Sequence, residues 1–459
     1  MKYVSSILFL LLILSLISAH NFCYSQEPGT KKEIIIDEVI ITGNEVTEKE
    51  IILREIESKP GKTLDLVTLK EDVDRLNNLK LFTKVDIIPV PVSNDSMKLI
   101  FDVQESFYII PVPQGGIKEG SLKKVWVGLK LNWKNFRGRN EDLNFSFGIG
   151  YEPFVRASYS VPWITQNRFF TSFSAGYSRT YNLIYDTSTA PVNLKDAPRY
   201  SADNYNAAVE FGKKFDRSNS LSLGLGYNSI NLSEYVIGRT LSPNAKDRYM
   251  TLNLNYIRDT RDLFAYPLSG TLVEAGYSKY GIANRYIDFN RMRADVRRYI
   301  LIKLSDDYAV TWANRVNGII SFGGAIPSYL KEAFGFSRVI RGWDDVAFEG
   351  DNLLGVFTEL RVPVIQPFFV SGTDIPLIKN ISFLKEMSYK FGLYTTLFFD
   401  MGGVWNKSDK LSKTQFRRGF GIGLNALLPF NFVGRMDWAF RRENDKYKGQ
   451  IIFNLGASF

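Results

Sequence analysis

The chain offers few side chains for covalent or metal chemistry. Among its 459 residues there is one histidine, His20, and one cysteine, Cys23. Both lie in an N-terminal segment that is predicted to be cleaved, so the mature chain would lack imidazole and thiol groups. This excludes disulfide scaffolds, zinc sites built from Cys or His, Cys nucleophiles and His-based triads. A hydrolase would need a Ser-Lys or carboxylate dyad, and none stands out. We therefore expect no enzyme activity and no cofactor.

Three charged residues far apart in the sequence form the most interesting constellation. Arg341 lies in a long predicted loop, and alternation in the flanking strands places Glu359 and Asp400 on the face opposite the apolar side chains. A guanidinium held by carboxylates in a shielded space makes a bidentate pair that can fix a loop. An equally compatible interpretation from spacing alone is a solvated Arg341 outside, with both acids lining a wet pore.

The elements that would position these residues are strands, because the sequence alternates with a period of two from about residue 106 onward. In Leu143 to Tyr151 and in Phe420 to Leu424, large apolar residues alternate with Gly, Ser and Asn. A soluble sandwich would also alternate. Small polar residues on the second face and long polar linkers, such as Tyr181 to Tyr200, instead favour a transmembrane β-barrel. We count about sixteen strands from Phe107 to Phe459, an even number as in bacterial barrels.

The N-terminus has the features of a secretory signal. Lys2 precedes the apolar run from Ile7 to Ile17, and small or polar residues follow to Ser25. We predict a signal peptide over residues 1–25. The net charge of +9 is spread among acidic residues, so lipid headgroups are a better expected partner than nucleic acid.

Residues 33–105 are predicted to form a small α+β domain with the order βααββ. The expected strands are Ile34 to Ile41, Val85 to Val92 and Lys98 to Val103. The expected helices are Thr47 to Glu57, with a capping box of Thr47 and Glu50, and about Val67 to Leu79. The predicted architecture is thus an all-β barrel over residues 106–459, preceded by this domain.

Several short motifs, in this order and spacing, resemble the BamA/TamA-type outer-membrane assembly proteins. The loop segment Ile340-Arg341-Gly342-Trp343 is similar to the Arg-Gly-aromatic motif of that family. Residues 33–105 resemble one POTRA domain. The segments Asn135 to Gly138 and Tyr256 to Asp262, the latter with Pro267 and Gly270, resemble an early turn and an Arg-Asp turn of the family.

This resemblance implies roles for individual residues. Arg341 would anchor an inward-folded loop with Glu359 and Asp400 as lumen partners, Gly342 would allow a tight backbone, and Trp343 would pack the loop tip against the wall. Phe459 would be the C-terminal aromatic signal for barrel assembly. The strand region Phe107 to Ile117 contains two prolines, so the seam between first and last strands could open sideways, or this could be a plain edge irregularity.

The function implied by the resemblance is assembly, insertion or translocation of outer-membrane proteins. The POTRA-like domain would sit in the periplasm and bind unfolded clients by β-augmentation, and the barrel seam or lumen would guide them. The expected partners are outer-membrane lipid, unfolded outer-membrane or secreted proteins, and periplasmic or lipoprotein accessory factors. The alternative is a secretion pore that exports one dedicated partner protein.

Overall fold

The computed structural model describes residues 33–456 except for short gaps. The gaps are residues 118–121, 165–166, 184–198, 236, 283, 336–337, 344–345, 377–384, 386–387 and 430–431. The predicted signal peptide and Phe459 lie outside the described residues. Within the described part, no helix is long and apolar enough to cross a bilayer.

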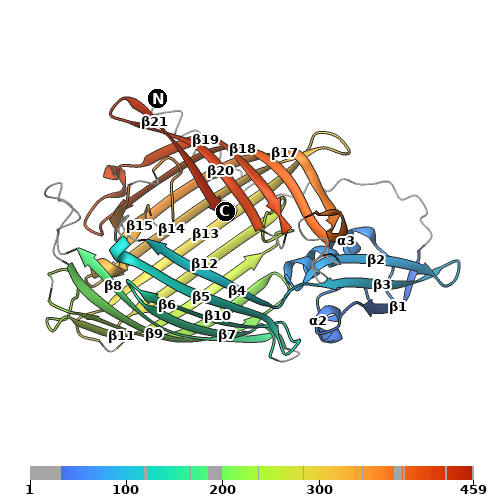
Figure 1. Cartoon of the computed structure of the whole chain (residues 1–459), viewed down its shortest axis with the longest axis horizontal. Coiled ribbons are helices and arrows are strands. Elements are labelled where there is room, and N and C mark those ends of the chain that lie inside the picture. Colours follow the sequence, from blue (N-terminus) through green and yellow to red (C-terminus); the bar gives the residue numbers. More distant parts are fainter. Residues whose placement is uncertain are drawn as a thin grey trace.

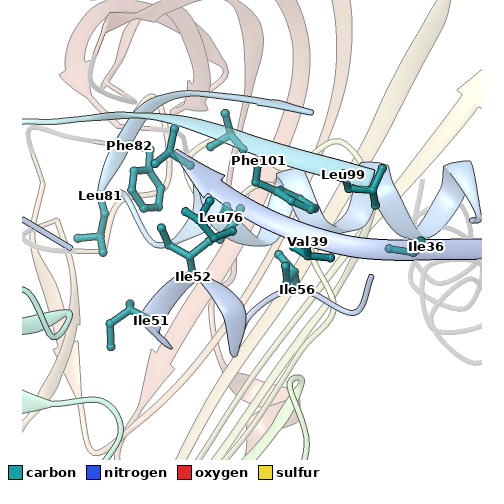
Figure 2. Close-up of a cluster of buried hydrophobic side chains, with 13 residues drawn as sticks. Ile36, Val39, Ile51, Ile52, Ile56, Leu76, Leu81, Phe82, Leu99 and Phe101 are labelled. Atoms are coloured by element: carbon teal, nitrogen blue, oxygen red, sulfur yellow. The ribbon is translucent and has the colours of Figure 1, made fainter. Parts of the chain in front are cut away.

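The N-terminal domain contains two helices and three strands in the predicted βααββ order. They are β1 (Ile35–Thr42), α2 (Lys49–Leu53), α3 (Leu66–Asn78), β2 (Phe82–Pro91) and β3 (Ser96–Glu105). β3 is the central strand, parallel to β1 and antiparallel to β2. Apolar side chains of the helices, such as Ile52 and Leu76, pack on one face of this sheet against Leu99 and Phe101 of β3 (Figure 2). The Asp65 carboxylate caps α3 by accepting from the amides of Val67 and Thr68, a standard N-cap arrangement.

The first predicted helix is wrong in length and in its cap. The helix ends at Leu53 and not at Glu57, and its N-cap is Glu48, which makes no side-chain capping bond. The Thr47 hydroxyl instead donates to Glu105 Oε1 at 2.5 Å and lies 2.8 Å from the Tyr108 hydroxyl. Long-range partners have therefore replaced the local capping box.

The rest of the chain forms a single antiparallel sheet of sixteen strands, which confirms the predicted fold class and strand number. The first eight are β4 (Ile109–Ile117), β5 (Val125–Phe136), β6 (Glu141–Gly150), β7 (Phe154–Val161), β8 (Phe169–Leu183), β9 (Arg199–Lys214), β10 (Asn219–Leu232) and β11 (Lys246–Asp259). The others are β12 (Gly270–Tyr280), β13 (Phe289–Lys303), β14 (Ala309–Gly323), β17 (Asn352–Ser371), β18 (Ser388–Trp405), β19 (Arg417–Leu428), β20 (Phe432–Glu443) and β21 (Lys446–Leu455). The strands curve around a lumen, and the small domain lies at one end of it (Figure 1).

The alternation of side chains gives this barrel an apolar outer face and a polar interior. On β10, Leu223 and Leu225 are exposed on the outside while Ser222 is buried. The buried polar and charged residues of the barrel include Asn314, Glu359, Arg361, Thr396, Asp400 and Asp437. This is the pattern of a barrel whose outer surface faces lipid.

The sheet has two ends that do not pair with each other. β4 and β21 are the terminal strands of the hydrogen-bonding order, and within the described residues no ladder joins them (Figure 1). Side chains on β21 are correspondingly exposed, with Phe453 and Leu455 each at 74%. Unpaired backbone groups on an edge strand can add a further strand.

Candidate functional site: a loop arginine and its carboxylate partners in the barrel lumen

The long loop between β14 and β17 folds into the lumen at the end away from the small domain. It contains a short hairpin, β15 (Glu332–Phe334) with β16 (Phe348–Gly350). Phe334, Ile340 and Trp343 of the loop are buried in a cluster with wall residues of β13, β14 and β17. Burial of these apolar side chains removes them from water and holds the described part of the loop against the wall.

Arg341 lies at the centre of this loop and contacts both predicted carboxylates. Its Nε donates to Asp400 Oδ2 and its Nη2 to Asp400 Oδ1, each at 2.8 Å, and Nη1 donates to Glu359 Oε2 at 2.7 Å. The backbone amide of Arg341 also donates to Asp400 Oδ2, at 3.1 Å. The structure thus brings together three residues that are up to 59 positions apart; their role as a loop anchor remains a prediction.

Burial makes this ion-pair cluster energetically important. The side chains of Arg341, Glu359 and Asp400 are each exposed by 2% or less. The guanidinium also stacks on Phe398, with its central carbon 3.5 Å from the ring centroid. The aromatic ring therefore covers one face of the guanidinium and attracts its positive charge. A charge in such a place is stable only while its partners are present, because each partner alone would be buried and uncompensated.

Two further arginines and a third carboxylate complete the cluster. Arg361 Nε donates to Glu359 Oε1 at 2.9 Å. Asp437 on β20 lies 2.8 Å from Arg435 Nε and 4.0 Å from Arg341 Nη1. Three guanidinium groups therefore face three carboxylates, and the cluster has no formal net charge.

The two residues after Arg341 are also fixed by the wall. Gly342 has a φ of +91°, a left-handed conformation that favours glycine, and its carbonyl accepts from Arg441 Nη1 at 2.9 Å. Trp343 donates through Nε1 to the carbonyl of Arg418 at 2.9 Å. The guanidinium groups of Arg417 and Arg441 lie over its ring.

Sequence reasoning missed Asp437, Arg435, Arg417 and Arg441, and it gave Arg361 no partner. The signal for Asp437 was available, since it alternates with the apolar residues Met436 and Trp438 on β20. Arg417 and Arg441 both lie over the Trp343 ring, and Arg441 also donates to the Gly342 carbonyl. No spacing rule indicates these contacts. Among the described residues, no group of three or more acidic, His or Cys side chains could hold a metal ion.

Gly419 on β19 provides a test of the loop's fit to the wall. A Cβ atom at this position would lie 1.8 Å from the carbonyl oxygen of Arg341. Because that atom belongs to the backbone, the Gly419→Ala variant can fold only if the loop moves away from β19, at a cost of about 1–3 kcal/mol. We expect faster proteolysis of the loop than in the unaltered protein.

The matched control for Gly419→Ala is Gly434→Ala on the neighbouring strand. Its added Cβ would meet only the flexible end of Leu428, at 3.4 Å. Limited proteolysis of folded protein in detergent is the measurement. Equal cleavage of the loop in both variants would show that the loop does not depend on contact with β19.

Comparison with known proteins agrees with the two-part architecture. Residues 135–459 match the model of the Omp85 superfamily domain, and residues 34–106 match that of the POTRA domain, described as a surface antigen variable number repeat. The chain is 20% identical over 449 residues to outer membrane protein assembly factor BamA of Nitratidesulfovibrio vulgaris, covering 94% of this chain and 52% of the relative.

A second relative and a solved structure are also similar to this chain. Chloroplastic outer envelope protein 80 of Arabidopsis thaliana is 28% identical over 437 residues, covering 89% of this chain and 54% of the relative. The solved structure of CdiB from Escherichia coli aligns with a TM-score of 0.54 at 11% identity, covering 96% of this chain and 92% of that one. The chain spans about half the length of the curated relatives it matches.

Proposed function

The chain belongs to the Omp85 superfamily, and on that basis we propose that it assembles other β-barrel proteins into the outer membrane. The barrel lies in the outer membrane and the POTRA domain in the periplasm. The barrel end beside the POTRA domain is therefore periplasmic, and the loop between β14 and β17 enters from outside. We propose that the protein acts by strand pairing and shape, without covalent catalysis or a cofactor.

The observation that carries this proposal is the seam between β4 and β21, where no ladder joins the described residues of the two strands. β4 contains Pro111 and Pro113, whose nitrogens cannot donate hydrogen bonds. Prolines are tolerated on an edge strand where the missing donors point away from its one partner, which here is β5. Two seam-facing donors are thus absent from β4, and this weakens closure against β21. A client strand can pair with the exposed edge of β21 instead.

The POTRA domain offers a second pairing edge. The outer edge of β1 is occupied, because the Ile36 amide donates to the Lys62 carbonyl at 2.9 Å and Gly61 donates back to Ile36 at 2.8 Å. β2 is the other edge of the sheet. Its far half contains Pro89 and Pro91, which lack amide donors. We propose that extended clients pair with β2 between Thr83 and Ile88 by β-augmentation.

The loop between β14 and β17 (residues 324–351), here called the anchored loop, would support one side of the seam. Through Arg341 it contacts β17 and β18, and through Gly342 and Trp343 it contacts β20 and β19. These four strands adjoin β21 in the sheet order. We propose that the loop keeps this wall rigid while the β4 side moves, and that the filled lumen favours a client route through the seam.

Reconstitution tests the proposed function directly. The purified protein in lipid vesicles is mixed with an unfolded outer-membrane barrel protein, and client folding is followed by the mobility of unheated samples on a gel. We expect faster folding than in empty vesicles. Folding no faster than in empty vesicles, with conductance in planar bilayers and export of one dedicated protein, would instead support the secretion pore. Accessory factors would be sought by cross-linking to the POTRA domain in cells.

A further inference from the structure

The periplasmic turn between β11 and β12, here called the lumen turn (residues 260–269), has a backbone that its own side chains hold in place. The Asp262 carboxylate accepts from the amides of Leu263 at 2.8 Å, Leu268 at 3.0 Å and Ser269 at 3.1 Å. Gly270 closes the turn with a φ of +101°, and a Cβ there would lie 2.2 Å from the Thr260 carbonyl oxygen. A turn fixed by three bonds to one carboxylate can move as a unit.

The tip of the lumen turn points into the barrel and contacts its walls. Tyr266 is 3% exposed, and its ring lies 5.0 Å from that of Tyr394 on β18. Asn425 on β19 donates to the Tyr266 hydroxyl at 3.1 Å, and Thr311 on β14 donates to the Leu268 carbonyl at 3.1 Å. The turn is therefore part of the lumen filling.

Arg361 connects the lumen turn to the anchored loop. Its Nη1 donates to the Pro267 carbonyl at 2.7 Å, and its guanidinium lies over the Tyr266 ring at 4.4 Å. The same guanidinium donates through Nε to Glu359, whose other oxygen accepts from Arg341. Arg361 is fully buried, so a shift of the turn must displace Arg361 or leave a buried group unsatisfied.

The opposite side of the lumen turn is bound to the POTRA domain. Asn78, the last residue of α3, donates through Nδ2 to the Asp262 carbonyl at 2.6 Å and accepts through Oδ1 from the Phe264 amide at 3.0 Å. Asp74 lies one helical turn earlier, and burial together with the charge of Asp262 raises its pKa to about 6. The two surfaces are thus closely packed.

We propose that the lumen turn couples the position of the POTRA domain to the anchoring of the extracellular loop. The route runs from Asn78 through the lumen turn to Arg361 and Glu359, and from there to Arg341. Residues Asn78 and Tyr266 are positioning residues in this route. The inference rests on the proposed function. The coupling would allow a client bound to the POTRA domain to change how firmly the loop between β14 and β17 is held in the lumen.

Hydrogen exchange of the loop in the Asn78→Ala variant tests the coupling. The whole protein in detergent is measured, and the reporter is the peptide containing the Arg341 amide, which is bonded to Asp400. We expect this peptide to exchange about fivefold faster or more, the lower end of typical coupling between sites. Exchange unchanged from the unaltered protein would overturn the proposal.

Arg217→Ala is the matched control. Arg217 also joins the barrel to the POTRA domain, through Glu57 and the Ile56 carbonyl, but it lies on the turn between β9 and β10. We expect this variant to leave loop exchange unchanged. An equal rise in both variants would show general loosening of the POTRA domain and would also overturn the proposal.

A second variant separates coupling from misfolding. Tyr266→Phe keeps the ring over which Arg361 lies and removes only the hydroxyl that accepts from Asn425, so it should raise loop exchange less than Tyr266→Ala, which removes the ring as well. Combined with Asn78→Ala, Tyr266→Ala should add little, because residues in one route are not additive. A fully additive effect would contradict the proposed route. Exchange is measured without a client, so its outcome is independent of whether the protein assembles barrels.

Discussion

The Arg341→Ala variant is expected to release the loop between β14 and β17 from the lumen and to lose most client assembly. The change removes one guanidinium and leaves Asp400 without its bidentate partner and Glu359 with Arg361 alone. Removing one partner from a buried ion pair costs about 3–5 kcal/mol. A loss of that size exceeds what the remaining contacts of a single loop are expected to compensate.

The measurement for Arg341→Ala combines loop proteolysis with client folding in vesicles. Arg338→Ala is the control, because Arg338 lies in the same loop and pairs with Glu332 inside it, with its side chain 35% exposed. We expect the control to behave like the unaltered protein. A loop that stays protected in Arg341→Ala would show that the apolar cluster alone holds it, and the proposed anchor would be wrong.

The barrel could be predicted from the sequence because every membrane-spanning strand requires the same alternation of side chains, and this alternation recurs along the chain. Each strand must place apolar side chains toward lipid and small or polar ones inside, so the alternation is visible in segments such as β6, β10 and β19. The even strand number followed from the same pattern. That no ladder joins β4 to β21 in the described part of the chain could be anticipated only in part, from the prolines of β4.

The errors arose where contacts distant in sequence decided the local structure. Thr47 has the spacing of a capping residue, but it bonds to Glu105 and Tyr108, and Asn135 of the barrel donates to its hydroxyl at 2.9 Å. The predicted helix was also too long at its other end, where the amides of Glu57 and Ser58 donate to the Asp72 carboxylate of α3. Local spacing rules contain no information about partners some sixty to ninety positions away.

The candidate site shows the same division. Side-chain parity placed Glu359 and Asp400 in the lumen, and the structure places Arg341 between them. Side-chain parity could not reveal that Arg361 also donates to the Pro267 carbonyl of the lumen turn. That contact depends on how far this periplasmic turn extends into the barrel. Phe459 lies outside the described residues, and its role stays a prediction.

A disulfide across the seam is expected to abolish client folding, because it prevents the β4 and β21 edges from separating. The cysteine pairs would join Val112 of β4 to successive positions of β21. The chain has a single native cysteine, Cys23, in the predicted signal peptide. A control pair at Met436 and Phe453 joins β20 to β21, which are already paired in register, and therefore leaves the seam free.

Client folding by the oxidised seam variant in vesicles tests the central claim most directly. If clients are assembled through the opening between β4 and β21, folding falls to the level of empty vesicles when the disulfide forms and returns when it is reduced, while the control pair stays active in both states. Equal folding by the oxidised and reduced seam variant would contradict assembly through the seam.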